Sequence, residues 1–287
     1  MRTHDGKKEY IKKFVQQAIL EDVGDGDHTT LSTIPKDKAG EAKLIVKEEG
    51  ILAGVEIALE IINQIDPTLA HEVLIHDGAS VKIGDIALIL KGKIHSILIA
   101  ERLILNVMQR MSGIATTTNR YAKLLAGTKT KILDTRKTTP LLRLLEKEAV
   151  KIGGGTNHRF GLYDMILIKD NHVDYSGGIT QALTRANAYR DTLNKHIEIE
   201  IEVRNFEELA EVITFGKVDR IMLDNFSPSD VKKAVDIIAE RFVTEASGGI
   251  TEDTLQAYAA AGVDFISVGA LTHSVKSLDL SLKAKLV

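Results

Sequence analysis

Short apolar runs alternate with helix-period segments through the second half of the chain, and this rhythm constrains the fold most. The runs occupy residues 132–134, 165–169, 197–203, 220–224, 243–247 and 265–269. Strands that alternate with helices at such spacing are typical of βαβ units, which form parallel sheets with right-handed crossovers. The pattern therefore predicts six parallel strands.

Six such units could form an incomplete barrel or an open doubly wound sheet, and spacing alone does not choose between them. Barrel enzymes gather functional side chains from several strand ends at one mouth. An open sheet concentrates them at one switch point instead. Every predicted strand here ends at or just before a polar residue or glycine, namely Arg136, Lys169, Glu202, Asp224, Ser247 and Gly269. We therefore favour an incomplete, six-stranded α/β barrel.

The first part of the chain has a different pattern. Residues 42–46 alternate as a strand, 55–65 follow a helical period, and two strands are expected near 73–75 and 86–90. A long helix is expected over 95–125, with an interruption near Ser112 and Gly113. We expect an α+β domain over residues 1–115, joined by the C-terminal segment 274–287, and a barrel domain over 116–273. A chain of 287 residues with 44% apolar content can form two such cores.

Composition excludes several classes of function. The net charge of −3 gives no overall basic field for nucleic acid. The absence of cysteine excludes disulfides, thiolate metal sites and a cysteine nucleophile. The N-terminal segment repeats lysines through a helical pattern and lacks the apolar core of a signal peptide. Residues 94–107 are too short and too charged to span a bilayer. We expect a cytoplasmic protein.

An acidic, turn-rich segment at residues 21–30 resembles a calcium loop at first sight. Its carboxylates lack the spacing and the closing bidentate glutamate of an EF-hand. We interpret it as a structural loop.

Cationic residues gather between residues 134 and 172 beside glycines and hydroxyls. They are Arg136, Lys137, His158, Arg159 and Lys169. An isolated Arg-Lys pair is usually a solvated surface, and an isolated triple glycine is usually a flexible loop. The combination at strand ends, however, favours a site that binds several carboxylates or phosphates at once.

Two loops after the last strands carry small residues before a predicted helix start. They contain Ser247, Gly248 and Gly249 in one case and Gly269 in the other. Such loops are often ordinary helix entries, but after the final strands of a barrel they commonly bind phosphate through backbone N–H groups. Together they indicate a phosphoester site.

Carboxylates complete the predicted mouth. Glu200 and Glu202 share one face of a strand and Asp224 ends the next, while one of Glu198, Glu200 and Glu202 is expected to be solvated or structural. Such acids can hold magnesium or accept hydrogen bonds from ribose hydroxyls. The three features together predict transfer of a phosphorylated sugar to an anionic acceptor. Motifs of serine hydrolases, zinc proteases and dinucleotide enzymes do not occur.

Ordered motifs along nearly the whole chain resemble those of the quinolinate phosphoribosyltransferase family. They are Glu101-Arg102, Gln109-Arg110-Met111-Ser112-Gly113, Asp134-Thr135-Arg136-Lys137-Thr138-Thr139-Pro140, Gly153-Gly154-Gly155, His158-Arg159, Lys169-Asp170-Asn171-His172, Leu223-Asp224-Asn225, Ser247-Gly248-Gly249-Ile250 and Gly269-Ala270-Leu271-Thr272-His273. The resemblance implies an N-terminal α+β sandwich domain joined to an incomplete α/β barrel, in a homodimer or an assembly of dimers. It also implies the reaction of quinolinate with phosphoribosyl pyrophosphate, assisted by Mg²⁺, to give nicotinate mononucleotide, pyrophosphate and CO₂ in de novo NAD biosynthesis.

The resemblance also implies roles for individual residues. Quinolinate would be held by Arg136, His158, Arg159 and Lys169, with Arg102 supplied by the neighbouring subunit. Phosphoribosyl pyrophosphate would be held by Lys137, Glu202, Asp224, Ser247, Gly248, Gly249, Gly269 and His273. Glu202 and Asp224 would hold Mg²⁺ directly or through water, and the catalytic residues would be Lys137, Lys169, Glu202 and Asp224.

Two positions depart from the pattern of the family. Leu141 stands where the family usually has glycine, and Glu148 where an aromatic residue is common. Both concern the shape of a loop rather than the chemistry.

The nearest rival function is that of a related phosphoribosyltransferase of the molybdate-operon type with another acceptor. The other is a sugar-phosphate binding protein without catalysis, which would not need the complete cation set.

Overall fold

The computed structural model describes residues 4–285, and the chain divides into two compact units. The first unit comprises the chain up to residue 119, residues 139–154 and the segment from 274 onward. The second comprises residues 120–138 and 155–273. The C-terminal segment thus belongs to the first unit. Within the described residues, no helix combines the length and apolar character needed to cross a membrane.

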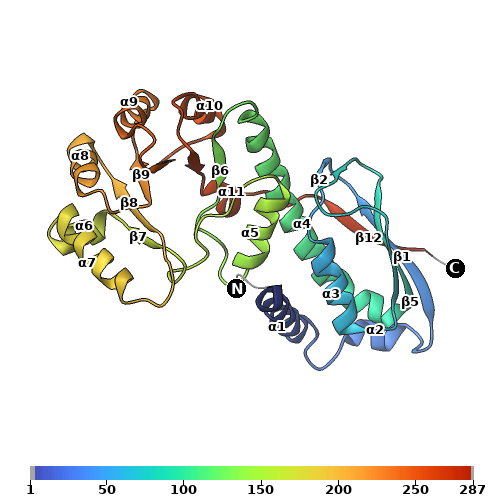
Figure 1. Ribbon diagram of the computed structural model, residues 1–287. Coiled ribbons are helices and arrows are strands. Elements are labelled where there is room, and N and C mark those ends of the chain that lie inside the picture. The colour runs from blue at the N-terminus through green and yellow to red at the C-terminus, as the bar shows by residue number, and fades with distance from the viewer. Residues whose placement is uncertain (1–3, 286–287) are drawn as a thin grey trace. The chain divides into compact units, whose positions relative to one another are not determined.

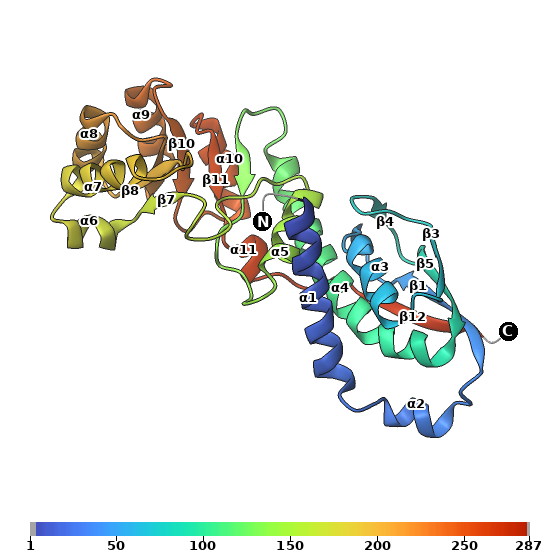
Figure 2. The same ribbon diagram turned by 60° about the horizontal axis from the view of Figure 1, so that its bottom comes forward.

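The first unit is built on a four-stranded antiparallel sheet with the order β12-β1-β5-β3. Both views show α3 and α4 beside this sheet (Figure 1, Figure 2). The elements of the first unit are α1 (His4–Val23), α2 (His28–Thr33), β1 (Ala39–Val46), β2 (Gly50–Ile51), α3 (Val55–Ile65), β3 (Ala70–Val73), β4 (Ser80–Val81), β5 (Ile86–Lys93), most of α4 (Ile94–Leu124), α5 (Arg143–Ile152) and β12 (Leu280–Lys285). The predicted helix over 55–65 and the α+β character are confirmed.

The predicted interruption of the long helix is wrong, because α4 runs continuously from Ile94 to Leu124. The Ser112 hydroxyl donates to the carbonyl of Ala53 and accepts from its N–H, so its polar group is satisfied in the core. A Cβ on Gly113 would lie 2.2 Å from the carbonyl oxygen of Lys276. Glycine here permits close packing inside the helix and does not end it.

The acidic segment at residues 21–30 is a loop only over residues 24–27, because α1 ends at Val23 and α2 begins at His28. Asp27 caps α2 by accepting a hydrogen bond from the Thr30 N–H at 3.0 Å. Capping of this kind satisfies an N–H group that the helix itself leaves without a partner. The sequence pattern did not predict the short helix that follows the loop.

The second unit confirms the six predicted parallel strands. The sheet order is β6-β11-β10-β9-β8-β7, so the first strand pairs with the last. Helices α8, α9 and α10 lie outside the strands that they connect (Figure 1). The elements are β6 (Lys131–Leu133), β7 (Ile166–Ile168), α6 (Asp170–Ser176), α7 (Ile179–Asp191), β8 (Ile199–Val203), α8 (Phe206–Phe215), β9 (Arg220–Asp224), α9 (Pro228–Ile238), β10 (Val243–Ser247), α10 (Glu252–Ala260), β11 (Phe265–Ser267) and α11 (Ala270–His273).

Capping residues start these helices directly after the strand ends. Asn205 accepts the N–H of Glu208 at the start of α8, and Ser227 accepts the N–H of Asp230 at the start of α9. Pro228 follows Ser227 at the first helical turn, where its missing N–H costs nothing. Short loops of this kind keep the C-terminal ends of the strands close to one another.

Leu141 adopts a left-handed backbone conformation with φ of 65°, which explains why a glycine suits this position. Its side chain is 83% exposed and therefore contributes little to the core. Because a left-handed residue with a bulky side chain costs about 1 kcal/mol and asparagine tolerates this region better, Leu141→Asn should raise the free energy of unfolding by up to about 1 kcal/mol. Leu141→Val should lower it. Urea unfolding with unchanged m-values would test both, and a stabilising valine would contradict this account.

Candidate active site

A pocket of about 880 Å³ opens at the C-terminal ends of the parallel strands in the second unit. It is lined by every residue that the sequence assigned to the site except Arg102, namely Arg136, Lys137, His158, Arg159, Lys169, Glu202, Asp224, Ser247, Gly248, Gly249, Gly269 and His273. Arg102 lies on α4 in the first unit, where its side chain is exposed. Its expected place at a subunit interface stays a prediction.

One wall of the pocket carries the cations. Arg136 follows β6, and Arg159 lies in the loop before β7, where its Nη1 donates to the Met165 carbonyl at 3.3 Å. Burial and the nearby charge of Arg136 both lower the pKa of Arg159. Two guanidinium groups that disfavour each other in this way are a suitable pair for a ligand with more than one carboxylate.

Lys169 links the cations to the acids at the end of β7. Its Nζ lies 2.6 Å from Oε2 of Glu202, which is almost buried at the end of β8. Asp224 ends β9, and its pKa is raised by burial and by the charge of Glu202. The Asn225 side-chain amide donates to Asp224 at 2.6 Å. Two acids and an ammonium group thus share the pocket floor.

The loop after β10 forms the glycine-rich wall. Gly248 and Gly249 both have left-handed backbones, with φ of 97° and 61°. A Cβ on Gly248 would lie 2.2 Å from Oδ1 of Asn225, so this residue must be glycine, whereas a Cβ on Gly249 would meet nothing within 4 Å. A backbone of this form directs N–H groups toward an anion.

The loop after β11 lies beside this wall. A Cβ on Gly269 would come within 3.1 Å of the side chains of Lys137 and His273. The Thr272 hydroxyl donates to the Lys137 carbonyl at 2.9 Å and holds that segment in place. Glycine at 269 therefore leaves room for the side chains of Lys137 and His273 at the pocket.

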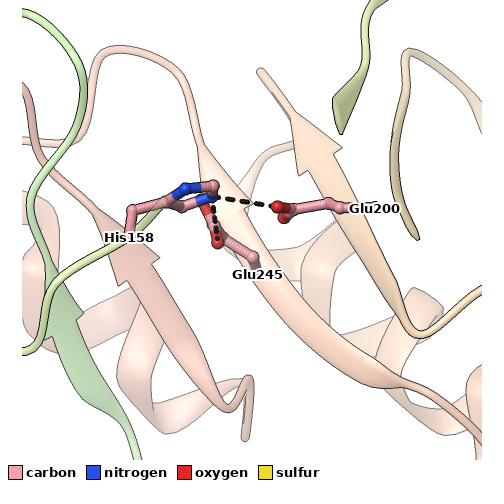
Figure 3. Close-up of side chains that lie close together, drawn as sticks. All are labelled: His158, Glu200 and Glu245. Atoms are coloured by element: carbon pink, nitrogen blue, oxygen red, sulfur yellow. Dashed lines mark ion pairs between the residues drawn. The ribbon is translucent and has the colours of Figure 1, made fainter. Parts of the chain in front are cut away.

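Glu200 does not lie at the mouth of the pocket, although the alternation of β8 predicted that it could meet Glu202 and Asp224 there. It is fully buried within the sheet, and Oε2 lies 2.9 Å from Nε2 of His158. Glu245 of β10, which was not predicted as a site residue, lies 3.4 Å from the same nitrogen (Figure 3). Glu198, in contrast, is exposed, as expected for a solvated charge. The alternation of β8 indicated that Glu200 and Glu202 share a face, but not how deep each lies.

Further pocket residues were also missed, among them Thr135, Asp170, Asn225, Thr251 and Ser267. The one available signal was their position directly beside predicted site residues. Short polar side chains next to a strand end are too common in turns to be selected from one sequence.

Comparison with known proteins agrees with this geometry. Residues 114–283 match the family described as quinolinate phosphoribosyl transferase, C-terminal domain, and residues 27–112 match the N-terminal domain of the same family. A quinolinate phosphoribosyltransferase (decarboxylating) of Nicotiana tabacum is 46% identical over 288 residues, covering 95% of this chain and 82% of that protein. A probable nicotinate-nucleotide pyrophosphorylase (carboxylating) of Bacillus subtilis is 44% identical, with coverage of 96% and 94%. The solved nicotinate-nucleotide pyrophosphorylase of Francisella tularensis superposes with a TM-score of 0.90 at 43% identity, covering 96% of both chains.

Proposed function

Because the chain belongs to the quinolinate phosphoribosyl transferase family, we propose that it transfers the phosphoribosyl group of phosphoribosyl pyrophosphate to quinolinate. The products are nicotinate mononucleotide, pyrophosphate and CO₂, in de novo NAD biosynthesis. The observation that carries this proposal is one pocket that combines a cationic wall, two acids and a glycine-rich loop. A protein that only binds phosphate would not need the cationic wall and the acids beside it.

Quinolinate binds at the cationic wall. Its two carboxylates pair with Arg136 and Arg159, and Lys169, which lines the same pocket and contacts Glu202, adds a third cation. The 5′-phosphate of the second substrate binds at Ser247, Gly248 and Gly249 beside Gly269 and His273. Lys137, whose side chain lies beside Gly269, meets the pyrophosphate.

The chemistry follows from these positions. The pyridine nitrogen of quinolinate already carries a lone pair, so no base is needed to activate it. It forms a bond to C1 of the ribose as the bond from C1 to pyrophosphate breaks. Lys137 stabilises the leaving anion, and Glu202 and Asp224 offset positive charge that develops on the sugar. The ring nitrogen is then cationic and stabilises the electron pair that stays on the adjacent carbon when its carboxylate departs as CO₂, and a proton then adds to that pair.

Magnesium fits the acids present. Glu202 and Asp224 offer hard oxygen ligands, and burial together with the charge of Glu202 raises the pKa of Asp224, an unfavourable effect that a bound cation would relieve. When bound, the ion supplies positive charge to the pyrophosphate. We propose these two residues as its protein ligands.

The finer architecture and assembly are also proposals. An incomplete barrel is supported by the strand order, since β6 pairs with β11 and the pairing is missing between β6 and β7. An open doubly wound sheet would reverse its order instead. We further propose a cytoplasmic homodimer, or an assembly of dimers, in which Arg102 reaches the site of the neighbouring subunit.

The direct test is incubation with quinolinate, phosphoribosyl pyrophosphate and Mg²⁺, with detection of nicotinate mononucleotide by mass spectrometry. We expect turnover of quinolinate and at least a thirtyfold lower kcat/KM with nicotinate. Loss of one carboxylate leaves a buried cation without its partner, which costs about 2 to 5 kcal/mol. Equal rates with both acceptors would refute the assignment of quinolinate. Product formation unaffected by a chelator would refute the role of magnesium.

A further inference from the structure

Beside Arg159 lies a cluster of four ionisable side chains, of which His158, Glu200 and Glu245 are buried and Arg220 is partly buried. Glu200 and Glu245 have no exposed surface, and they reach the same imidazole nitrogen from two different strands (Figure 3). Arg220 Nη1 lies 3.0 Å from Glu245, and its guanidinium carbon lies 4.7 Å from the centre of the Phe265 ring. Buried charges are expensive unless they are paired, so such a cluster is expected to have a purpose beyond filling space.

Both ring nitrogens of His158 have partners inside the protein. Nε2 lies 2.9 Å from Glu200 and 3.4 Å from Glu245. Nδ1 accepts the main-chain N–H of Arg159 at 2.7 Å. A substrate carboxylate could bind a ring nitrogen only by displacing one of these contacts. His158 therefore contributes to the pocket wall while its polar atoms face the protein.

The backbone on either side of Arg159 is held as firmly. The N–H of His158 donates to the buried carboxylate of Asp134 at 2.8 Å, which ties the loop to β6. On the other side, Asp164 accepts the N–H groups of Phe160 and Gly161 at 2.8 and 2.9 Å. Arg159 thus occupies a short segment whose position is fixed through the His158 ring by β8 and β10.

We propose that Glu200 and Glu245 are positioning residues that hold the His158 ring, and that His158 in turn positions Arg159 for a substrate carboxylate. The inference rests on the proposed binding of quinolinate beside Arg159, and it reassigns His158 from a ligand to a support.

The same three side chains could hold a metal ion, because their ligand atoms lie within 4.8 Å of one another. Contacts within the protein argue against that use. His158 reaches both acids and Arg220 pairs with Glu245, so a metal ion would have to displace these contacts. We therefore interpret the cluster as a closed network of polar contacts.

A double-mutant cycle tests the proposal, with the KM for quinolinate measured in His158→Gln, Arg159→Ala and the double variant. Each single change should raise KM at least tenfold. If His158 acts through Arg159, the double variant should resemble Arg159→Ala alone. Losses that multiply would show that His158 binds the substrate independently, and the proposal would then be wrong. Absence of quinolinate turnover by the parent protein would instead refute the proposed function.

Substitution of the two buried acids provides a second test of the proposal. Glu245→Gln and Glu200→Gln keep the shape of the side chain and remove its charge. Each should raise the KM for quinolinate about tenfold, leave the KM for phosphoribosyl pyrophosphate within about twofold, and add little in the Arg159→Ala background. A rise in both KM values with a lower melting temperature would indicate a purely structural role. A stoichiometric metal in the parent that Glu245→Gln loses would also overturn the proposal. The His158 and Arg159 cycle leaves both acids intact, so it tests the coupling of His158 to Arg159 even if the acid variants do not fold.

Discussion

Gly249→Asp should abolish the use of phosphoribosyl pyrophosphate, whereas Gly249→Asn should retain most of it. The two side chains have nearly the same size, and both tolerate the left-handed backbone that Gly249 adopts at φ of 61°. A Cβ at this position meets nothing within 4 Å, so neither change is excluded by space. They differ in charge. A carboxylate beside a bound phosphate should cost several kcal/mol, which corresponds to a rise in KM of about a thousandfold.

The measurement is the KM for phosphoribosyl pyrophosphate in both variants, with quinolinate binding followed separately by calorimetry. Quinolinate affinity should change little, because Arg136 and Arg159 stand on other loops. Gly248→Ala serves as a steric comparison, since its Cβ would collide with Asn225. Equal KM values for the Asp and Asn variants would mean that the phosphate binds elsewhere in the pocket.

The periodic strands of the second unit could be predicted because their signal is local. The ranges 220–224 and 243–247 agree with β9 and β10 residue for residue. Parallel strands are covered on both faces and therefore read as short apolar runs between polar ends. The polar residues at the ends of these runs also predicted where the pocket lies, because parallel strands bring all their C-terminal ends to one edge of the sheet.

Depth and long-range contact could not be predicted in the same way. Glu200 and Glu202 lie two residues apart on the same face of β8. Glu200 nevertheless pairs with His158 in the interior, whereas Glu202 pairs with Lys169 in the pocket. That difference depends on residues 42 and 33 positions away, respectively, in the chain. Likewise, glycine at 113 predicts a break in a helix unless the carbonyl of Lys276 is known to pack against it. Contacts of this kind depend on the tertiary structure and cannot be predicted from the local sequence.

Arg102→Ala and Lys169→Ala should each be nearly inactive alone, and mixing the two proteins should restore activity. We expect this because Lys169 lines the pocket, while Arg102 is an exposed residue of the other unit that we propose serves a neighbouring subunit. In a mixed dimer, one site collects both lesions. The other keeps its own Lys169 and receives an intact Arg102, so it is native. Random reassembly gives about half mixed dimers with one good site in two, and activity should return to roughly a quarter of the parent value.

Subunit exchange would be verified by mass spectrometry of the reassembled, differently labelled chains. A mixture of Arg136→Ala and Lys169→Ala is the matched control, because both residues line the pocket of one chain. That mixed dimer carries one lesion in each site and should stay inactive. Should the Arg102 mixture also stay inactive although exchange is complete, Arg102 acts within its own chain, and the cross-subunit assignment fails. Recovery in the control as well would mean that Arg136 or Lys169 is shared between subunits, because complementation requires that the two lesions fall in the same site.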